Sequence, residues 1–175
     1  MSPLGRSDAL TNLVTERPDT STVDAAALVA HGPVLLAVAR TMAGNEADAQ
    51  DLVQVTFEIA LRNLSSLRKP DATRAWLLRI EVREAMRFTR RLRRLVSLEG
   101  TVRDIGADDP AMSDRIALRQ AIRRLPLRIR AAIALHHLAG MTVRETADAL
   151  GVTENTIKTE LKAGLARLRS ELGHG

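Results

Sequence analysis

The sequence predicts an all-α protein made of two small helical domains joined by a flexible linker. Hydrophobic residues make up 45 % of the 175 residues, but aromatic residues make up only 2 %. The cores must therefore consist of Leu, Ile, Val and Ala, whereas strands favour aromatic and β-branched residues. Apolar residues recur at helical spacing along most of the chain, and this period stops near residue 100.

The first part of the chain predicts a tail and two helices. Residues 1–22 combine Ser, Thr, Pro and charged residues without a period, which is typical of a disordered tail. Apolar residues then recur from Ala25 to about Ala43, and Gly44-Asn45 ends this helix. A second helix is expected from about Glu46 to Leu64. Its expected buried stripe comprises Val53, Phe57, Ala60, Leu61 and Leu64.

A third helix and a linker follow. Residues 65–70 interrupt the helical pattern, Asp71 can cap the next helix, and that helix reaches about Arg94. Its expected inner residues are Trp76, Leu77, Ile80 and Phe88. The next stretch holds two glycines, one proline and four acidic residues without a helical period, so it is predicted to be a linker. The predicted divisions are a tail (1–22), a first domain (23–95), the linker (96–113) and a second domain (114–175).

The second domain is expected to end in a helix-turn-helix. A helix from about Asp114 pauses at Leu125-Pro126, and the helix after it ends at Gly140. The expected inner face of that helix comprises Ile129, Ala132, Ile133 and His136. Thr142 and Glu145 then have the spacing of a capping box, and Gly151 can end the short helix that follows.

The next helix of this motif is the expected DNA-binding element. Thr153 can cap it, and its inner residues are Ile157, Leu161, Leu165 and Leu168. In a helix-turn-helix the second helix enters the major groove. The side chains available to reach DNA are Glu154, Asn155, Thr156, Lys158, Thr159 and Lys162. The alternative is a helical hairpin whose polar face is only solvated.

The third helix is strongly basic. Residues 74–94 contain eight arginines and two glutamates. At helical spacing, one row is formed by Arg79, Arg83, Arg87, Arg90 and Arg94. Guanidinium groups in one row repel one another unless an anion lies alongside, so the row predicts contact with nucleic-acid phosphates. A solvated face, with Arg stems covering apolar surface, is the alternative.

Charge and composition exclude several classes of protein. The net charge of +5 favours a polyanionic partner. No apolar run is long enough for a transmembrane helix or a signal peptide, so we expect a cytoplasmic protein without membrane insertion. The absence of cysteine rules out disulfides and thiolate metal sites. His136 and His137 are adjacent and diverge on a helix, so they cannot share a metal ion without distortion of the helix. We expect no catalytic residue, no metal and no cofactor.

Three stretches resemble regions 2 and 4 of extracytoplasmic-function sigma factors, which belong to the sigma-70 family. Residues 45–64, NEADAQDLVQVTFEIALRNL, resemble the family's D-A-E-D-L-V-Q-E-T-F helix. Residues 74–91, RAWLLRIEVREAMRFTRR, resemble its A-W-L-x-x-I-A-x-N-x-A-x-x-x-x-R-R helix. Residues 123–169 are similar to its region 4, including G-x-S-x-x-E-I-A-x-x-L-G-x-S-x-x-T-V-K-S-R-L.

The resemblance implies a sigma factor, which binds core RNA polymerase and directs transcription initiation at promoters. It implies that the second helix docks on polymerase through Asp51, Gln54, Val55 and Glu58. It implies that the third helix and the loop before it bind the −10 element through Lys69, Arg79, Arg83, Arg87, Arg90 and Arg91. The helix-turn-helix would bind the −35 element through Arg144, Thr153, Glu154, Asn155, Thr156, Lys158, Thr159 and Lys162. Family members are commonly held inactive by an anti-sigma factor, so such a partner is expected.

Three residues depart from the family's pattern. Val55 stands where the family usually has Glu, and Arg83 where many members have Asn. Glu160 replaces the usual Arg, and it would repel DNA unless it accepts from a cytosine amino group or pairs with an arginine. Two alternatives therefore stay open: an ordinary helix-turn-helix regulator, and a sigma-like protein that melts promoters weakly.

Overall fold

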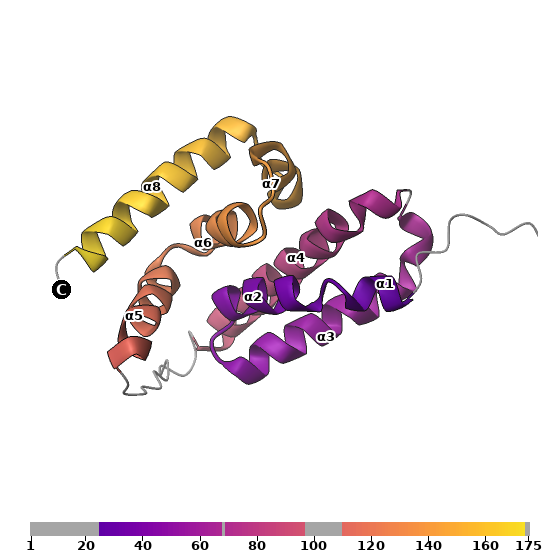
Figure 1. Cartoon of the computed structure of the whole chain (residues 1–175), viewed down its shortest axis with the longest axis horizontal. Helices are drawn as coiled ribbons and strands as arrows, with labels where there is room; N and C mark the ends of the chain where they lie inside the picture. Colours follow the sequence, from indigo (N-terminus) through magenta and orange to yellow (C-terminus); the bar gives the residue numbers. More distant parts are fainter. Residues whose placement is uncertain (1–24, 68, 97–109, 174–175) are drawn as a thin grey trace, which may run out of the picture.

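The computed structural model describes residues 25–67, 69–96 and 110–173, and the regular elements in these ranges are helical (Figure 1). The N-terminal helices are α1 (Ala25–Val29), α2 (Gly32–Met42), α3 (Glu46–Arg62) and α4 (Thr73–Val96). The C-terminal helices are α5 (Pro110–Arg124), α6 (Leu127–Ile133), α7 (Val143–Leu150) and α8 (Glu154–Leu172). The prediction of an all-α fold is confirmed. The expected tail lies outside the described residues, as does most of the expected linker.

Short turns complete the description. Two 3-10 turns, η1 (Leu64–Ser66) and η2 (Pro70–Ala72), lie between α3 and α4, and a π-helical turn, η3 (Ala134–Leu138), follows α6. Helices α2, α3 and α4 pack against one another, while α8 packs on α5, α6 and α7 (Figure 1). Helix α7 also packs on α4, and η3 packs on α2, so the two groups of helices are in contact.

Local sequence signals explain where the helices begin. The side chain of Asn45 accepts a hydrogen bond from the backbone N–H of Asp48 at 2.8 Å, which caps α3. Glu46 and Asp48 lie in the first turn of this helix, where negative charge stabilises the exposed N–H groups. Helix α3 therefore starts at the residue that the sequence predicts.

Other helix boundaries differ from the predictions. The first helix was expected to run unbroken from Ala25 to Ala43, but α1 ends at Val29 and α2 begins at Gly32. Pro33 lies in the first turn of α2, where its missing N–H costs nothing, and it could not have continued α1. Helix α4 begins after the turn η2 rather than at an Asp71 cap. Helix α5 begins at Pro110, inside the stretch predicted as linker.

Two residues that the helical period assigned to the core lie on the surface. Leu61 is 52 % exposed on α3 and Phe88 is 49 % exposed on α4. Ala60 and Leu77 are buried as predicted. The remaining members of both stripes are half-buried: Val53, Phe57, Leu64, Trp76 and Ile80. The spacing identified the apolar side of each helix correctly but not how far neighbouring helices cover it.

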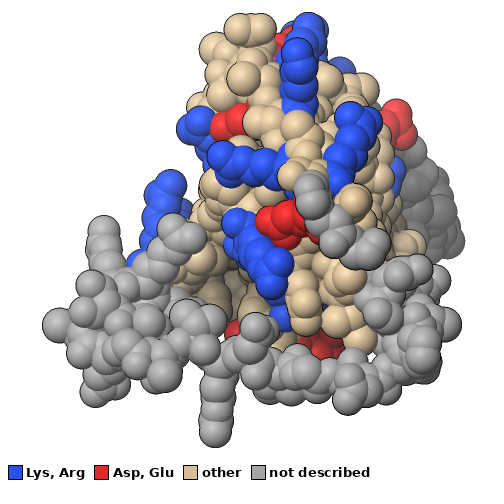
Figure 2. Space-filling model, turned by 90° about the vertical axis from the view of Figure 1, so that its left-hand side faces the viewer, with Lys and Arg blue, Asp and Glu red and all other residues tan. Residues whose placement is uncertain are grey.

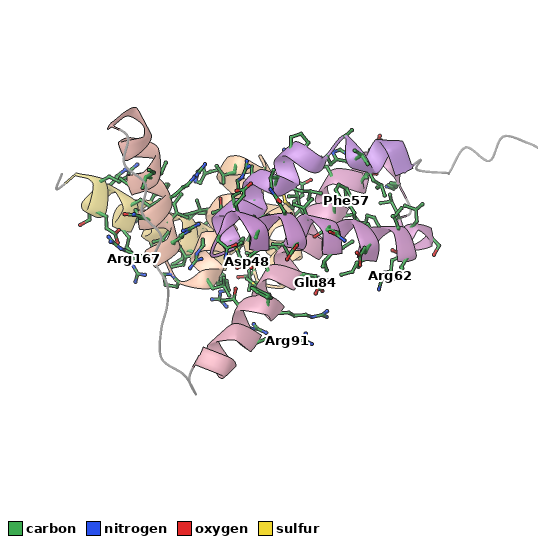
Figure 3. The ribbon with its side chains drawn as sticks, turned by 90° about the horizontal axis from the view of Figure 1, so that it is seen from below. Asp48, Phe57, Arg62, Glu84, Arg91 and Arg167 are labelled. Carbon is green, nitrogen blue, oxygen red and sulfur yellow. The ribbon has the colours of Figure 1, made fainter. Side chains whose placement is uncertain are left out.

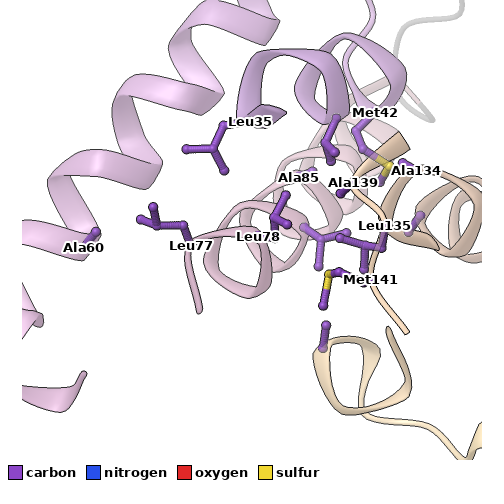
Figure 4. Packing of buried hydrophobic residues seen from close by; sticks show 14 of the residues in the cluster. Leu35, Met42, Ala60, Leu77, Leu78, Ala85, Ala134, Leu135, Ala139 and Met141 are labelled. Carbon is purple, nitrogen blue, oxygen red and sulfur yellow. The ribbon is translucent and has the colours of Figure 1, made fainter. Parts of the chain in front are cut away.

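The largest hydrophobic core joins the N-terminal to the C-terminal helices (Figure 4). Leu35 and Met42 on α2 and Leu78 on α4 belong to the same buried cluster as Leu135 on η3 and Met141 before α7. We call this contact of α2 and α4 with η3 and α7 the seam. Hydrogen bonds also join the two groups of helices: the Arg74 guanidinium donates to the carbonyl of Ala139, and Arg130 Nη1 on α6 donates to the carbonyl of Met42 at 3.5 Å.

Candidate nucleic-acid and polymerase interface

The turn between α7 and α8 has the geometry of a helix-turn-helix. The Thr142 hydroxyl accepts from the Glu145 N–H at 3.1 Å, and the Glu145 carboxylate accepts from the Thr142 N–H at 2.8 Å. The carboxylate accepts from the Thr142 N–H and also from the Thr142 hydroxyl, at 2.8 Å, and these two bonds lower the pKa of Glu145 because they stabilise its charged form. Gly151 ends α7 with a φ of 67°, in the left-handed region that favours glycine. The predicted capping box and glycine stop are confirmed.

Helix α8 is anchored by its inner face. Ile157 is fully buried, and Leu161 and Leu168 are buried beside it. Leu165, also predicted to face inward, is half-buried. Gly164 lies where α8 crosses α6, so close that an added Cβ would lie 2.7 Å from side-chain atoms of Ile129 and Ile133. This close approach places α8 directly on α6, with its opposite face free.

The free face of α8 holds nearly all the residues predicted to bind DNA. Thr153 caps the helix, its hydroxyl accepting from the Thr156 N–H at 3.2 Å. Thr156 is half-buried, and its hydroxyl lies 2.8 Å from that of Thr153, so these two side chains form the cap. The exposed residues are Arg144 on α7, Thr153 itself, and Glu154, Asn155, Lys158, Thr159 and Lys162 on α8. Asn, Thr and Lys are side chains that can bond to base edges and phosphates.

Glu160 does not belong to that face. Its carboxylate accepts from Arg128 Nε at 2.5 Å, and its side chain is only 11 % exposed. The sequence left two ways for Glu160 to avoid repelling DNA, a bond to a cytosine amino group or a pair with an arginine. The structure shows the pair with an arginine.

Arginines also surround the far end of α8. Arg123 and Arg124 on α5 and Arg167 and Arg169 on α8 are exposed, and Figure 3 shows Arg167 pointing away from the body. Figure 2 looks at the end of the molecule where α5 and the C-terminal end of α8 lie, and Lys and Arg cover more of this face than Asp and Glu. The charge of this face suits phosphate groups beside the helix-turn-helix.

On α4, the predicted arginine row is present but uneven. Arg83, Arg87, Arg90 and the adjacent Arg91 are exposed, and Lys69 is exposed just before the helix. Figure 3 shows the C-terminal end of α4, with Arg91, projecting beyond the neighbouring helices. Arg87 pairs with Glu84 at 2.7 Å. Arg79 differs, because it is half-buried and its Nε is shielded from solvent. The side chain of Arg94 lies outside the described residues.

The predicted polymerase-docking residues form one exposed row on α3. Asp51, Gln54 and Glu58 are exposed, and Gln54 donates to Glu58 at 3.1 Å. Val55 is 40 % exposed. It borders a groove of about 310 Å³ between α3 and α4, whose wall includes Leu52 and Phe88. The departure at Val55 therefore adds apolar surface to an open groove.

One buried residue escaped the sequence predictions. Glu81 on α4 is completely buried, and neither carboxylate oxygen has a hydrogen-bond partner among the described residues. Burial raises the pKa of this carboxyl group to about 9. The family motif quoted above has alanine at this position. Glu at a position where the family has Ala is the only sign in the sequence that this residue is unusual. The packing of helices around α4 is needed to show that its side chain is buried.

The described residues place no three His, Cys, Asp or Glu side chains where they could hold a metal ion. None of the helices within the described ranges is both long and apolar enough to cross a membrane.

Comparison with known proteins identifies the family. Residues 28–95 match Sigma-70 region 2, and residues 115–168 match Sigma-70 region 4. The chain is 32 % identical over 146 residues to the ECF RNA polymerase sigma factor SigM of Mycobacterium tuberculosis (strain ATCC 25618 / H37Rv), covering 82 % of this chain and 74 % of the relative. It is 29 % identical over 129 residues to the RNA polymerase sigma factor SigV of Bacillus subtilis (strain 168), covering 73 % of this chain and 78 % of that protein.

Solved structures agree. The sigma factor RpoE from Bartonella quintana, in complex with the anti-sigma factor NepR, matches with a TM-score of 0.76 and 27 % identity, covering 85 % of this chain and 95 % of that chain. CnrH, in complex with the cytosolic domain of CnrY, matches with a TM-score of 0.65 and 25 % identity, covering 85 % of this chain and 86 % of that chain.

The fold and the two region matches define a sigma factor of the sigma-70 family. The chain belongs to its extracytoplasmic-function (ECF) group. Its function is therefore to bind core RNA polymerase and direct initiation at specific promoters, and it is not itself an enzyme. An unattached helix-turn-helix regulator would have no region 2, so that alternative is not supported.

Proposed function

We propose that three surfaces of this chain divide the work of a sigma factor. The row Asp51, Gln54, Val55 and Glu58 on α3 docks on core polymerase. The loop before α4 and the arginines of α4 bind the −10 element, and α8 with Arg144 binds the −35 element. The division corresponds to a first domain over 23–95 and a second over 114–175, with a linker between them. The protein acts in the cytoplasm, where polymerase and DNA are.

The observation that carries this proposal is that the residues of all three surfaces are exposed and that each surface lies on a different helix. Polar and apolar side chains on α3, arginines on α4, and amide, hydroxyl and ammonium groups on α8 each face outward. Exposed arginines fit a phosphate backbone, and the side chains of α8 fit base edges. An anti-sigma factor is a further proposed partner, supported by the solved relative RpoE, whose structure contains the anti-sigma factor NepR.

The test uses holoenzyme reconstituted from the chain and core polymerase on its native upstream DNA. We expect co-elution with the core and run-off transcripts.

The double variant Arg87→Ala, Arg90→Ala should bind the promoter more weakly. The slope of log affinity against log salt should become shallower by about one to two units, because two phosphate contacts are lost. The matched control is Arg40→Ala, which removes an exposed arginine paired with Glu46 on the same group of helices.

The contrary outcomes separate the parts of the proposal. An unchanged salt slope would mean that the arginine row of α4 is a solvated surface. Co-elution without transcripts would show that this chain binds polymerase but melts promoters weakly. Arg83, at the position where many family members have Asn, favours this alternative.

A further inference from the structure

Helix α8 is held on α6 by apolar contacts and by the ion pair between Arg128 and Glu160. Glu160 is 9 % exposed overall, and Arg128 reaches it from α6 across 32 residues of sequence. The pair lies one turn before Gly164, where the two helices come closest. The inner face and the pair therefore belong to the same contact.

Apolar contacts alone do not fix the rotation of a helix about its own axis. Ile157, Leu161 and Leu168 are buried, but the hydrophobic effect is not directional, so their burial restrains a small rotation less sharply than a directional bond does. A charge-assisted hydrogen bond is directional and short. A rotation of about 20° would move side-chain atoms about 6 Å from the axis by about 2 Å, enough to break a hydrogen bond to a base.

Position 160 lies at the edge of the buried face of α8. Thr159 and Lys162 are exposed on one side of it and Leu161 is buried on the other, and the Glu160 carboxylate is turned towards α6. Its second oxygen has no partner among the described residues. Loss of Arg128 would thus leave a mostly buried charge unpaired, and α8 would have to turn to solvate it.

We propose that the Arg128–Glu160 ion pair is a positioning device that sets the rotation of α8 on DNA. Glu160 itself does not contact the −35 element. The inference rests on the proposed role of α8 in −35 binding and adds two residues that control it without touching bases. The usual arginine of the family at this position is replaced here by an acid that pairs with Arg128 of the same chain.

A charge swap tests this inference. Full-length chains carrying Arg128→Glu, Glu160→Arg, or both are compared for binding to a native upstream duplex and to a random duplex of equal length. We expect each single reversal to lower the native-to-random affinity ratio about ten- to a hundredfold. The double reversal rebuilds the pair with opposite polarity and should restore the ratio to within about threefold, because the two changes are coupled.

Two controls keep the test decisive. Glu160→Gln keeps the shape of the side chain and should lower the ratio by about three- to tenfold, so it gives a result even if a reversal prevents folding. Arg40→Glu reverses an exposed arginine that pairs with Glu46 at 2.6 Å, on helices that carry none of the proposed −35 residues, and should leave the ratio unchanged.

The results that would overturn the inference are specific. If the double reversal does no better than Arg128→Glu alone, the two residues do not act as a pair on DNA binding. If Glu160→Arg raises the ratio, residue 160 contacts DNA directly. If wild-type protein shows no preference for the native duplex, the proposed −35 role of α8 fails first, and positioning for that role fails with it.

Discussion

Glu81 shows how much a single residue can affect this protein. It lies on α4 among Leu77, Leu78, Val82 and Ala85, all of which are buried. Burial raises the pKa of its carboxyl group to about 9, so the folded protein holds it as the neutral acid at pH 7. On unfolding, the carboxyl group returns to its ordinary pKa of 4.5 and releases its proton. The folded state therefore binds more protons than the unfolded state between these values.

This difference predicts how stability depends on pH. The free energy of unfolding should fall as pH rises from about 5 to 8.5, by up to about 1.4 kcal/mol per pH unit from this residue. Glu81→Gln removes the titrating group and should flatten that decline. Urea unfolding at several pH values measures it, with Glu58→Gln, an exposed carboxylate on α3, as the control. Parallel profiles for wild type and Glu81→Gln would contradict a buried neutral acid.

The sequence could not place Glu81 correctly. On a helix with eight arginines, an acid reads as part of a solvated charged face. Glu81 is buried because neighbouring helices pack against α4. Similarly, Glu160 could be recognised as unusual for the family, but its partner Arg128 is distant in sequence and only the fold brings the two together.

At the scale of helices, Gly164 is the position where sequence preference and packing disagree. In an exposed helix, replacing Gly by Ala stabilises by about 1 kcal/mol. Here an added Cβ would lie 2.7 Å from Ile129 Cγ2 and from Ile133 Cδ1. Because overpacking costs about 1–3 kcal/mol, Gly164→Ala should lower the free energy of unfolding by about 1–2 kcal/mol. Denaturant unfolding measures this, and a stabilised variant would show that α6 and α8 separate easily.

Helix starts and stops were predictable where the signal is local. The Asn45 cap, the Thr142 and Glu145 capping box and the Gly151 stop depend on neighbouring residues, and the structure shows all three. The apolar pattern from Ala25 to Ala43 does not show the break between α1 and α2, which is marked instead by Pro33 in the first turn of α2. Leu61 and Phe88 were assigned to the core because periodicity identifies an apolar side, whereas burial also needs a helix to cover it.

At the scale of the whole molecule, the seam holds the two groups of helices together. The −10 and −35 elements are centred about 25 base pairs apart, which is about 85 Å along B-form DNA at about 3.4 Å per base pair. Helices α4 and α7 touch each other in this structure. If α4 binds the −10 element and α8 the −35 element, as proposed above, one chain cannot keep this contact on the promoter, so we expect promoter binding to part the seam.

Distance measurements between two labels test this requirement. The chain contains no cysteine, so Ala47→Cys on α3 and Ala166→Cys on α8 give one label on each group of helices, both at exposed positions. Spin-label distances should form one short population in the free protein and a longer one in the holoenzyme bound to promoter DNA. The same distance in both states would show that the closed arrangement persists on DNA.

The seam also links folding to transcription. Leu78, Leu135 and Met141 belong to a core that neither group of helices completes alone, so separation returns apolar surface to water and lowers the cooperativity of folding. Substitutions that loosen this core make the open chain easier to reach and the folded chain easier to melt. Selection on the basal output of the regulon can therefore act on side chains that never contact DNA or polymerase, and thermal stability sets the limit to how far it can go.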